Sequence, residues 1–224
     1  MNDLKLRKEL IQTVLKMNEL GINQGTSGNA AVRSEDGYLI TPSGMAYEDI
    51  SPDDVVFKKF GGEYASPNGL RKPSSEWRFH EDIFTARQDV EAIVHTHGKA
   101  VMTIACLQKD VPPFHYMIGV TGAKTIRCAP YETFGTQELS DVAVQALGGR
   151  KACLLANHGQ IAVGGSLKQA LSMAVEVETL CEVYWRTLIA GGAVILDDQK
   201  MDEALAKFNK GYGSGKAFGS DGKS

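Results

Sequence analysis

The stretch "AIVHTHGKA" (residues 92–100) places two histidines two positions apart behind a short apolar run. In an extended strand, successive side chains point to opposite faces, so we expect His95 and His97 on one face and Thr96 on the other. Two imidazoles on one face can bind a single metal ion, but they cannot complete a tetrahedral shell. The stretch therefore predicts a strand that supplies part of a metal site, with the missing ligands elsewhere in the chain.

His158 is the candidate for a third imidazole. It stands in "ANHGQ" (residues 156–160), which predicts a tight turn between two apolar strands. A histidine beside glycine in such a turn can approach a site from another direction. Three imidazoles with one open position form a shell that catalytic zinc uses. Each histidine taken alone is more often structural than a ligand, but the joint pattern favours a metal site.

Glu76 is the candidate for an acid–base carboxylate. In "KPSSEWRFH" (residues 72–80) it follows Ser74 and Ser75 at the expected start of a helix. Free N–H groups and the helix dipole favour bound anions there, so the two serines could form a phosphate cradle beside an acid. Alternatively, the serines only cap the helix and Glu76 complements its dipole. The residues alone leave both interpretations open.

Two further loops have the composition of an anion site. "NQGTSGNAAVR" (residues 23–33) is rich in Gly, Ser and Thr but matches neither the P-loop nor the dinucleotide fingerprint. "ITPSGMAY" (residues 40–47) is a second such turn after a strand. Small residues let backbone amides approach an anion, and hydroxyls add donors. Together with the serine pair and the histidines, these loops favour a small phosphorylated or carboxylated substrate.

The overall composition excludes several classes of protein. The 224 residues suffice for one large domain with a full core, and 43% of them are hydrophobic. A formal net charge of −3 leaves no basic excess, so nucleic acid is not an expected partner. The charged start "MNDLKLRKEL" is unlike a signal peptide, and no apolar run reaches the roughly 18 residues of a membrane span. We therefore expect a cytoplasmic protein with no membrane partner.

The cysteines give no sign of a zinc ribbon or a redox motif. They are widely spaced, form no CxxC pair, and stand in apolar surroundings. We predict buried free thiols at these four positions: Cys106, Cys128, Cys153 and Cys181.

Hydrophobic periodicity and turn residues predict a single mixed α/β domain. Helices are expected at residues 4–20, 74–88, 99–107, 137–147 and 199–208, and after Ser166, which has capping-box spacing to Gln169. Strands are expected at residues 29–41 (two strands around a turn), 54–60, 91–97, 125–129 and 152–165, the last a hairpin turning at His158. Because most strands are joined by hairpins, we expect a largely antiparallel central sheet flanked by helices. This domain would span residues 1–212, with a flexible tail over residues 213–224.

Six motifs together resemble a known family. "GTSGN", "ITPSG", "KPSSEWRFH", "IVHTH", "CAPYETFGT" and "NHG" occur in the same order and at similar spacing in class II aldolases of the L-fuculose-1-phosphate aldolase type. The similarity extends from about Leu4 to Tyr212, nearly the whole chain. The wider family also contains sugar-phosphate 4-epimerases, pentulose-phosphate aldolases, decarboxylases of keto-acid phosphates and non-enzymatic adducin-like domains.

The resemblance implies a role for each matching position. It implies zinc ligands at His95, His97 and His158, with Glu76 as both fourth ligand and base. It implies phosphate-binding positions at Asn29, Ser43, Gly44, Ser74 and Ser75. It also implies an aromatic wall for the aldehyde at Phe134, a proton-donating tyrosine in a neighbouring subunit's site at Tyr116, and a second tyrosine at Tyr212.

Two departures from the family pattern bear on function. The tail carries an extra Gly211 before Tyr212 and lacks the arginine that usually follows, with Lys216 as a candidate substitute. This places the aldehyde end of the substrate in question. At position 76 the epimerase branch has Asp, so Glu76 favours an aldolase. A non-enzymatic relative would be expected to lack some of the histidines, and none is missing here.

The expected function is therefore a zinc-dependent aldolase. It would reversibly cleave a ketose 1-phosphate, such as L-fuculose 1-phosphate, to dihydroxyacetone phosphate and a small aldehyde. The resemblance implies one Zn²⁺ per subunit, with Mn²⁺ or Co²⁺ as substitutes, and a homotetramer with sites at subunit interfaces. The alternatives are an aldolase for 5-deoxyribulose or methylthioribulose 1-phosphate, a 4-epimerase or decarboxylase, and a metal-free interaction domain.

Overall fold

An eight-stranded sheet organises the chain, in the spatial order β4-β3-β2-β1-β5-β8-β7-β6. The computed structural model describes residues 3–211. The strands are β1 (Asn29–Ser34), β2 (Gly37–Ile40), β3 (Val56–Lys59), β4 (Tyr64–Ala65), β5 (Ala92–Thr96), β6 (Cys128–Ala129), β7 (Ala152–Leu155) and β8 (Gly159–Gly164). Neighbouring strands pair antiparallel, except that β6 and β7 pair in parallel. This confirms the predicted mixed domain with a largely antiparallel sheet.

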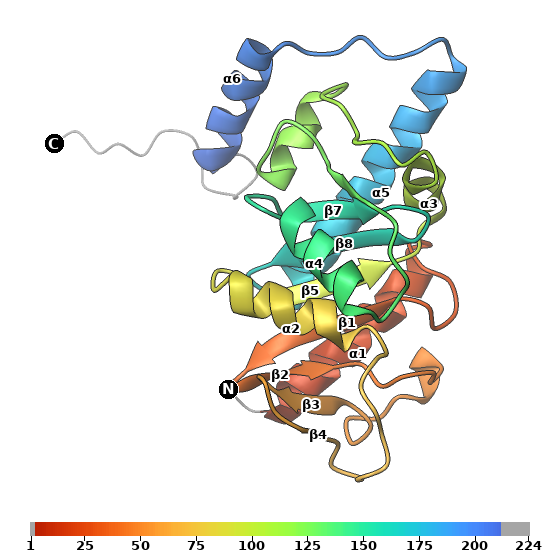
Figure 1. Ribbon diagram of the computed structural model, residues 1–224, viewed down its shortest axis with the longest axis vertical. Helices are drawn as coiled ribbons and strands as arrows, with labels where there is room; N and C mark the ends of the chain where they lie inside the picture. The colour runs from red at the N-terminus through yellow and green to blue at the C-terminus, as the bar shows by residue number, and fades with distance from the viewer. Residues whose placement is uncertain (1–2, 212–224) are drawn as a thin grey trace, which may run out of the picture.

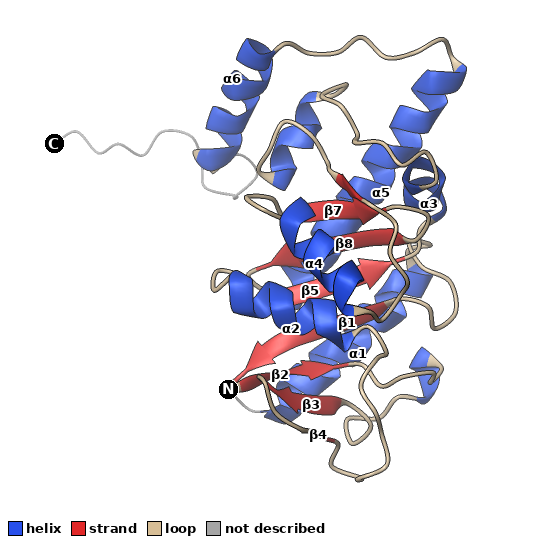
Figure 2. Ribbon diagram, in the orientation of Figure 1, coloured by secondary structure: helices blue, strands red, loops and turns tan. Residues whose placement is uncertain are grey.

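Helices cover both faces of the sheet. They are α1 (Asp3–Glu19), α2 (Trp77–Ala86), α3 (Lys99–Ala105), α4 (Gln137–Ala146), α5 (Leu167–Ile189) and α6 (Asp198–Asn209), with 3-10 helices η1 (Tyr47–Asp49) and η2 (Tyr116–Thr121). Figure 1 shows α2 and α4 in front of the sheet and α5 behind it. The same view coloured by secondary structure shows α6 packed beside a short helical turn at the upper end (Figure 2), which is η2. No helix within residues 3–211 is both long and apolar enough to cross a membrane.

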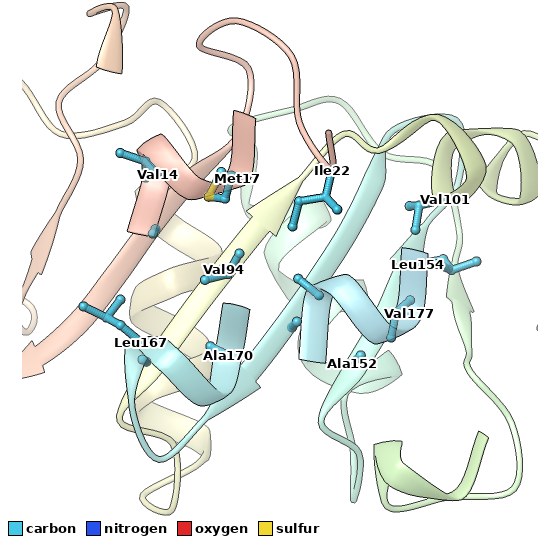
Figure 3. Packing of buried hydrophobic residues seen from close by; sticks show 14 of the residues in the cluster. Val14, Met17, Ile22, Val94, Val101, Ala152, Leu154, Leu167, Ala170 and Val177 are labelled. Atoms are coloured by element: carbon cyan, nitrogen blue, oxygen red, sulfur yellow. The ribbon is translucent and has the colours of Figure 1, made fainter. Parts of the chain in front are cut away.

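The central strand β5 is buried on both faces, which explains its continuous apolar sequence. Ala92 and Val94 belong to the core cluster under α1, α3 and α5, whereas Ile93 belongs to the cluster under α2 and α4. Figure 3 shows Val94 beside residues of α1 and α5. Because β5 lies between β1 and β8, His95 is opposite both Asn29 and Ile161. The strand that begins the metal motif therefore stands in the middle of the sheet.

Some local predictions need correction. The two-residue strand β4 is not among the strands expected from the sequence, because it is too short to show an alternating pattern. Cys153 and Cys181 are buried as predicted, but Cys106 is exposed, since it follows α3 at a surface turn. All four cysteines are free thiols.

The predictions for the C-terminal end fall largely beyond residue 211, the last that the structure describes. Tyr212, Lys216 and the expected tail over residues 213–224 lie outside the described residues. The domain boundary at residue 212 therefore stays a prediction.

Candidate metal centre

His95 is held by the neighbouring strand. Its Nδ1 lies 2.8 Å from the backbone oxygen of Gln160 on β8. A carbonyl oxygen only accepts, so Nδ1 carries a proton and donates it to this oxygen, which turns Nε2 towards Glu76 and His97. The Gln160 side chain donates in turn to Thr96 Oγ1 at 3.0 Å and to the Ala174 oxygen at 2.9 Å. The sheet thus fixes both the tautomer and the orientation of a buried imidazole.

Three imidazoles converge at the end of β5. His97 follows the last residue of that strand, and His158 lies in the turn between β7 and β8. Their ring centroids and that of His95 are 4.7 to 4.9 Å apart, with planes crossing at 80 to 86°. Nε2 of His97 is 2.8 Å from Nε2 of His95. Two ring nitrogens so close need a proton or a cation between them. The contact confirms that the two side chains point the same way, as predicted.

Glu76 stands directly beside these rings. Its Oε2 is 3.3 Å from Nε2 of His95, and its Oε1 is 3.3 Å from Nε2 of His158. Oε1 is buried and has no hydrogen-bond partner among residues 3–211. Its contact with His158 would be an ion pair only if that ring were protonated. An unsatisfied buried carboxylate oxygen beside three imidazoles fits a bound divalent cation. The candidate ligands His95, His97 and His158 offer atoms that all lie within 4.8 Å of one another.

Asn29 and His80 hold the other side of the carboxylate. The Asn29 side chain donates from Nδ2 to Glu76 Oε2 at 2.9 Å. Its Oδ1 lies 2.5 Å from Nε2 of His80, a buried residue of α2. Sequence reasoning missed His80, although its spacing of four residues from Glu76 at a helix start places both on one face. The role of Asn29 in phosphate binding stays a prediction.

The charges of the site suit a cation. Burial alone would raise the pKa of Glu76, but attraction and hydrogen bonding to His95, with help from His158 and Asn29, lower it to about 2. Burial, together with repulsion from His95, lowers the pKa of His97 to about 3 and that of His158 to about 4. At neutral pH the site therefore offers an anionic carboxylate and neutral rings at His97 and His158, which is the state that binds metals.

Two of the predicted anion loops lie side by side. Ser74 N donates to the Thr41 oxygen and Ser43 N donates to the Lys72 oxygen, both at 3.0 Å. Gly44 has a φ of +67°, which favours glycine at this turn. The hydrogen-bonded pairs bring "ITPSG" against "KPSSE" at the start of α2. The serines and the glycine named in the prediction therefore come from adjoining backbone.

The helix cap at α2 differs from the simpler alternative. Glu76, not a serine, occupies the N-cap position, and no side chain caps this helix end in the described part of the chain. Ser74 instead accepts a hydrogen bond from Glu76 N at 3.3 Å, and Ser75 is exposed. The serines are thus not engaged as helix caps, and they border the carboxylate as the anion-site interpretation requires.

A pocket of about 350 Å³ lies between two of the imidazoles, the start of α2 and the loop at Thr26 and Ser27. Its lining includes Ser27, Ser75, Glu76, His97, Phe134 and His158. At its rim Phe134 is 67% exposed and Tyr131 is 56% exposed, so the mouth is aromatic. A larger groove of about 1000 Å³ between α1 and α5 contains no histidine among its lining residues. The smaller pocket is therefore the one that contains candidate metal ligands and the candidate base.

Tyr116 lies away from this pocket within the chain. It begins η2, is 46% exposed, and stacks on Phe208 of α6 with ring centroids 6.3 Å apart. It lines a separate hollow with residues of α6. A single subunit thus does not bring Tyr116 to the imidazoles, and its action in a neighbouring subunit's site stays a prediction.

The imidazole cluster beside Glu76 is an arrangement that could hold a single metal ion. The pocket beside it is lined by Glu76, His97 and His158 and by the hydroxyl residues Thr26, Ser27 and Ser75. Comparison with known proteins identifies the class. The family described as "Class II Aldolase and Adducin N-terminal domain" matches residues 8–185. The chain belongs to the class II aldolase and adducin family, and it is an enzyme of the lyase class.

Individual relatives cover nearly the whole chain. The 5-methylthioribulose-1-phosphate/5-deoxyribulose-1-phosphate aldolase of Rhodospirillum rubrum is 50% identical over 210 residues, covering 94% of this chain and 93% of that protein. The L-fuculose phosphate aldolase of Escherichia coli is 44% identical over 210 residues, covering 93% and 96%. A solved structure of an L-fuculose 1-phosphate aldolase has a TM-score of 0.88 at 36% identity, covering 93% of this chain and all of that one. These findings confirm the predicted resemblance and fold.

Proposed function

We propose that the protein is a metal-dependent aldolase that reversibly cleaves a ketose 1-phosphate to dihydroxyacetone phosphate and a small aldehyde. The observation that carries this proposal is the buried Glu76 carboxylate, with one unsatisfied oxygen beside three imidazoles. A base together with a bound cation promotes carbon–carbon cleavage beside a carbonyl, and this pocket offers a carboxylate and imidazoles that could hold the cation. Membership of the aldolase family supports the same assignment.

His95, His97, His158 and Glu76 would hold one divalent ion per subunit. We propose Zn²⁺, with Mn²⁺ or Co²⁺ as substitutes, because three neutral nitrogen donors with a displaceable fourth ligand suit catalytic zinc. When bound, the ion supplies a Lewis acid that stabilises negative charge developing on the substrate's carbonyl oxygen. With few anionic ligands, little of the ion's charge is neutralised by the protein, which strengthens this effect.

Glu76 is proposed as the base. In the direction of condensation it takes a proton from C3 of dihydroxyacetone phosphate, and C3 then attacks the aldehyde carbon. Tyr116 of a neighbouring subunit protonates the oxygen that becomes the C4 hydroxyl. Cleavage runs these steps backward, so the protons and the electron pair balance in both directions. Tyr212 is proposed as a second tyrosine near the aldehyde, which makes a homotetramer with shared sites part of this proposal.

The phosphate is proposed to bind at the adjoining loops, through Ser43, Gly44, Ser74, Ser75 and Asn29. The backbone bonds between the two loops and the short distance from Ser74 to Glu76 support this placement. Asn29 donates one amide hydrogen to Glu76, and its nitrogen carries a second that can reach a phosphate oxygen. Binding the phosphate away from the reacting carbon orients the substrate without opposing the reaction.

The aldehyde end decides between two substrates. The sequence pattern pointed first to L-fuculose 1-phosphate, which ends in a hydroxylated carbon and a methyl group. Higher identity to the Rhodospirillum rubrum aldolase than to the Escherichia coli enzyme instead supports 5-deoxyribulose or 5-methylthioribulose 1-phosphate. The exposed faces of Phe134 and Tyr131 at the pocket mouth suit the aldehydes that these pentulose phosphates release, which lack the hydroxyl carried by the aldehyde from L-fuculose 1-phosphate. We therefore propose a 5-deoxypentulose 1-phosphate as the preferred substrate.

A substrate panel tests this proposal. Purified enzyme is incubated with each candidate ketose phosphate, and released dihydroxyacetone phosphate is measured with a coupled dehydrogenase. We expect release to be fastest from the 5-deoxypentulose phosphates, to stop with a chelator, and to return with Zn²⁺. The variants His97→Ala and His158→Ala should lose tight zinc binding and activity, since each removes one of three nitrogen ligands. No release from any ketose phosphate, or a near-normal rate and full zinc content in either variant, would contradict the proposal.

A further inference from the structure

Helix α3 connects two of the proposed metal ligands. Its first residue, Lys99, follows His97 by two positions. At its other end the Ala105 oxygen accepts a hydrogen bond from Asn157 N at 3.1 Å, and Gln108 donates to the Asn157 side chain at 2.7 Å. Asn157 immediately precedes His158. One short helix is therefore attached at both ends to segments that carry a candidate ligand.

A carboxylate from another helix fixes the start of α3. Glu178 of α5 accepts from Ala100 N at 2.8 Å and from Val101 N at 3.0 Å. The residue at the N-cap position, Gly98, has no side chain, so Glu178 satisfies N–H groups that a capping side chain would otherwise bond. Val101 of α3 and Val177 of α5 belong to one core cluster (Figure 3), which keeps the two helices together at this point.

A glycine is needed at position 98 because the Glu178 side chain lies against it, and not because of the backbone conformation there. Its φ of −66° and ψ of 148° are open to any residue. A Cβ at this position would overlap the Glu178 carboxylate. Since the carboxylate is the movable end of a side chain, a larger residue here would push it off the helix start. Gly98 and Glu178 thus form a matched pair directly after His97.

We propose that Glu178 is a positioning residue for the metal centre. By capping α3 it fixes the backbone at His97 and, through the far end of the helix, the separation of His97 from His158. The inference rests on the proposed role of these histidines as metal ligands. Groups that hold ligands in place contribute to metal affinity without touching the ion.

The test compares variants of this pair in the full chain. Glu178→Ala and Gly98→Ala both uncap α3, whereas Glu178→Gln keeps the shape and can accept only one of the two N–H groups. The matched control is Glu182→Gln, one turn along α5, which removes an exposed carboxylate paired with Arg186. Affinities for Zn²⁺ and Co²⁺ are measured by competition with a chelator. The absorption spectrum of bound Co²⁺ reports the ligand geometry, and unfolding of the metal-free protein reports the fold.

We expect Glu178→Ala and Gly98→Ala to bind either metal about 10- to 100-fold more weakly and to shift the Co²⁺ spectrum. Glu178→Gln should lie between these and wild type, and Glu182→Gln should match wild type. If Glu178→Ala unfolds at the assay temperature, Glu178→Gln and Gly98→Ala carry the test. A merely structural role would lower stability without changing the spectrum of the folded protein.

The double variant gives the sharpest outcome. In the Glu178→Ala background there is no carboxylate to displace, so adding Gly98→Ala should change metal affinity no further. The inference would be overturned if both single variants had the metal affinity and Co²⁺ spectrum of wild type. It would also be overturned if the losses of affinity in the single variants added up in the double variant. Either result would leave the proposed function standing. A wild-type protein that binds neither metal would overturn the proposed function and this inference with it.

Discussion

Glu76 has two roles in the proposed reaction that make opposite demands on its acidity. As a metal ligand it should be ionised, and attraction to His95 and His158 keeps its pKa at about 2 despite burial. As a base it needs a pKa nearer the working pH. Burial raises that pKa, so moving the carboxylate away from the imidazoles, while it stays in the pocket, strengthens it as a base. Displacement of Glu76 by substrate would therefore switch the residue from ligand to base.

The first prediction isolates the proton transfer. Glu76→Gln keeps the size of the side chain and the acceptor for Asn29, so we expect the fold to persist. Exchange of the C3 hydrogen of dihydroxyacetone phosphate with solvent should slow by roughly 10²- to 10⁴-fold, because the amide cannot take the proton. The exchange is followed by nuclear magnetic resonance in deuterated water, with zinc content measured on the same sample. Unchanged exchange at full zinc content would remove Glu76 from the role of base.

The second prediction concerns pH and the metal-free protein. Burial lowers the pKa of His80 and of His97 to about 3, and that of His158 to about 4, from the usual 6.5. The unfolded chain takes up these protons as the pH falls through 6.5, whereas the folded chain does not. Stability should therefore be full above 6.5 and fall as the pH decreases towards 4, by up to about 1.4 kcal/mol per pH unit for each histidine.

Urea unfolding of chelator-treated protein between about pH 7.5 and about pH 5 measures this slope. His80→Gln should reduce the slope by the share of one histidine. Glu76 does not interfere, because its lowered pKa affects stability only below its ordinary value of 4.5. A free energy of unfolding that is constant across this range would show that the rings are protonated equally in both states.

At the scale of single elements, the turn between β7 and β8 combines strain with function. Asn157 has a φ of +54°, a left-handed conformation that asparagine tolerates better than most residues. It also bonds to Gln108, which has a φ of +53°. The backbone before His158 therefore adopts a conformation that its residues disfavour, and contacts with neighbouring residues hold it there.

The third prediction tests this turn. Asn157→Ala should lower the free energy of unfolding by about 1 to 2 kcal/mol, because alanine disfavours a positive φ. Asn157→Gly loses the same bond to Gln108 but accepts the backbone, so it should be the more stable of the two. Urea unfolding of the two variants, with zinc titration alongside, makes the comparison. Equal stability of the alanine and glycine variants would show that the turn carries no backbone strain.

Local patterns predicted most of the elements and the metal triad. The apolar run before His95 and the histidine at a glycine turn are short-range signals, and each predicted both an element and a ligand. The role of His80 was not predicted, because its hydrogen-bond partner Asn29 is 51 residues away in sequence. The contact of Glu178 with the start of α3 was not predicted for the same reason, since Glu178 and Ala100 are 78 residues apart in sequence. Spacing shows what lies on one face of an element, but it does not show which elements meet.

On the scale of the whole molecule, the proposed proton donor Tyr116 is the residue that one chain does not bring to the imidazoles. Tyr116 stacks on α6 instead of lining the pocket of His97 and His158. Predicting its role from the sequence needed the family resemblance, because no local pattern tells which copy of the chain a side chain serves.

The fourth prediction tests a shared site. Tyr116→Phe and Glu76→Gln should each be inactive alone. When the two variants are mixed, unfolded and refolded together, some interfaces combine the intact tyrosine of one subunit with the intact glutamate of another. Activity should therefore partly return, as measured by release of dihydroxyacetone phosphate.

Each variant refolded by itself is the control, and light scattering establishes the number of subunits. Absence of restored activity despite demonstrated subunit exchange, or a monomer in solution, would leave Tyr116 as an ordinary surface aromatic. Restored activity would also locate the neighbour's contribution at η2.

The position of β5 between β1 and β8 has a consequence for biosynthesis. Asn29 and His95 pair early in the chain, but His158 and then Gln160, whose backbone oxygen holds the His95 ring, come much later. A ribosome has therefore made about two thirds of the protein before the complete set of ligands exists. Contacts so distant in sequence also slow folding. In the proposed metal centre, the ion could accordingly be held by all of its ligands only after β7 and the turn that carries His158 have been made.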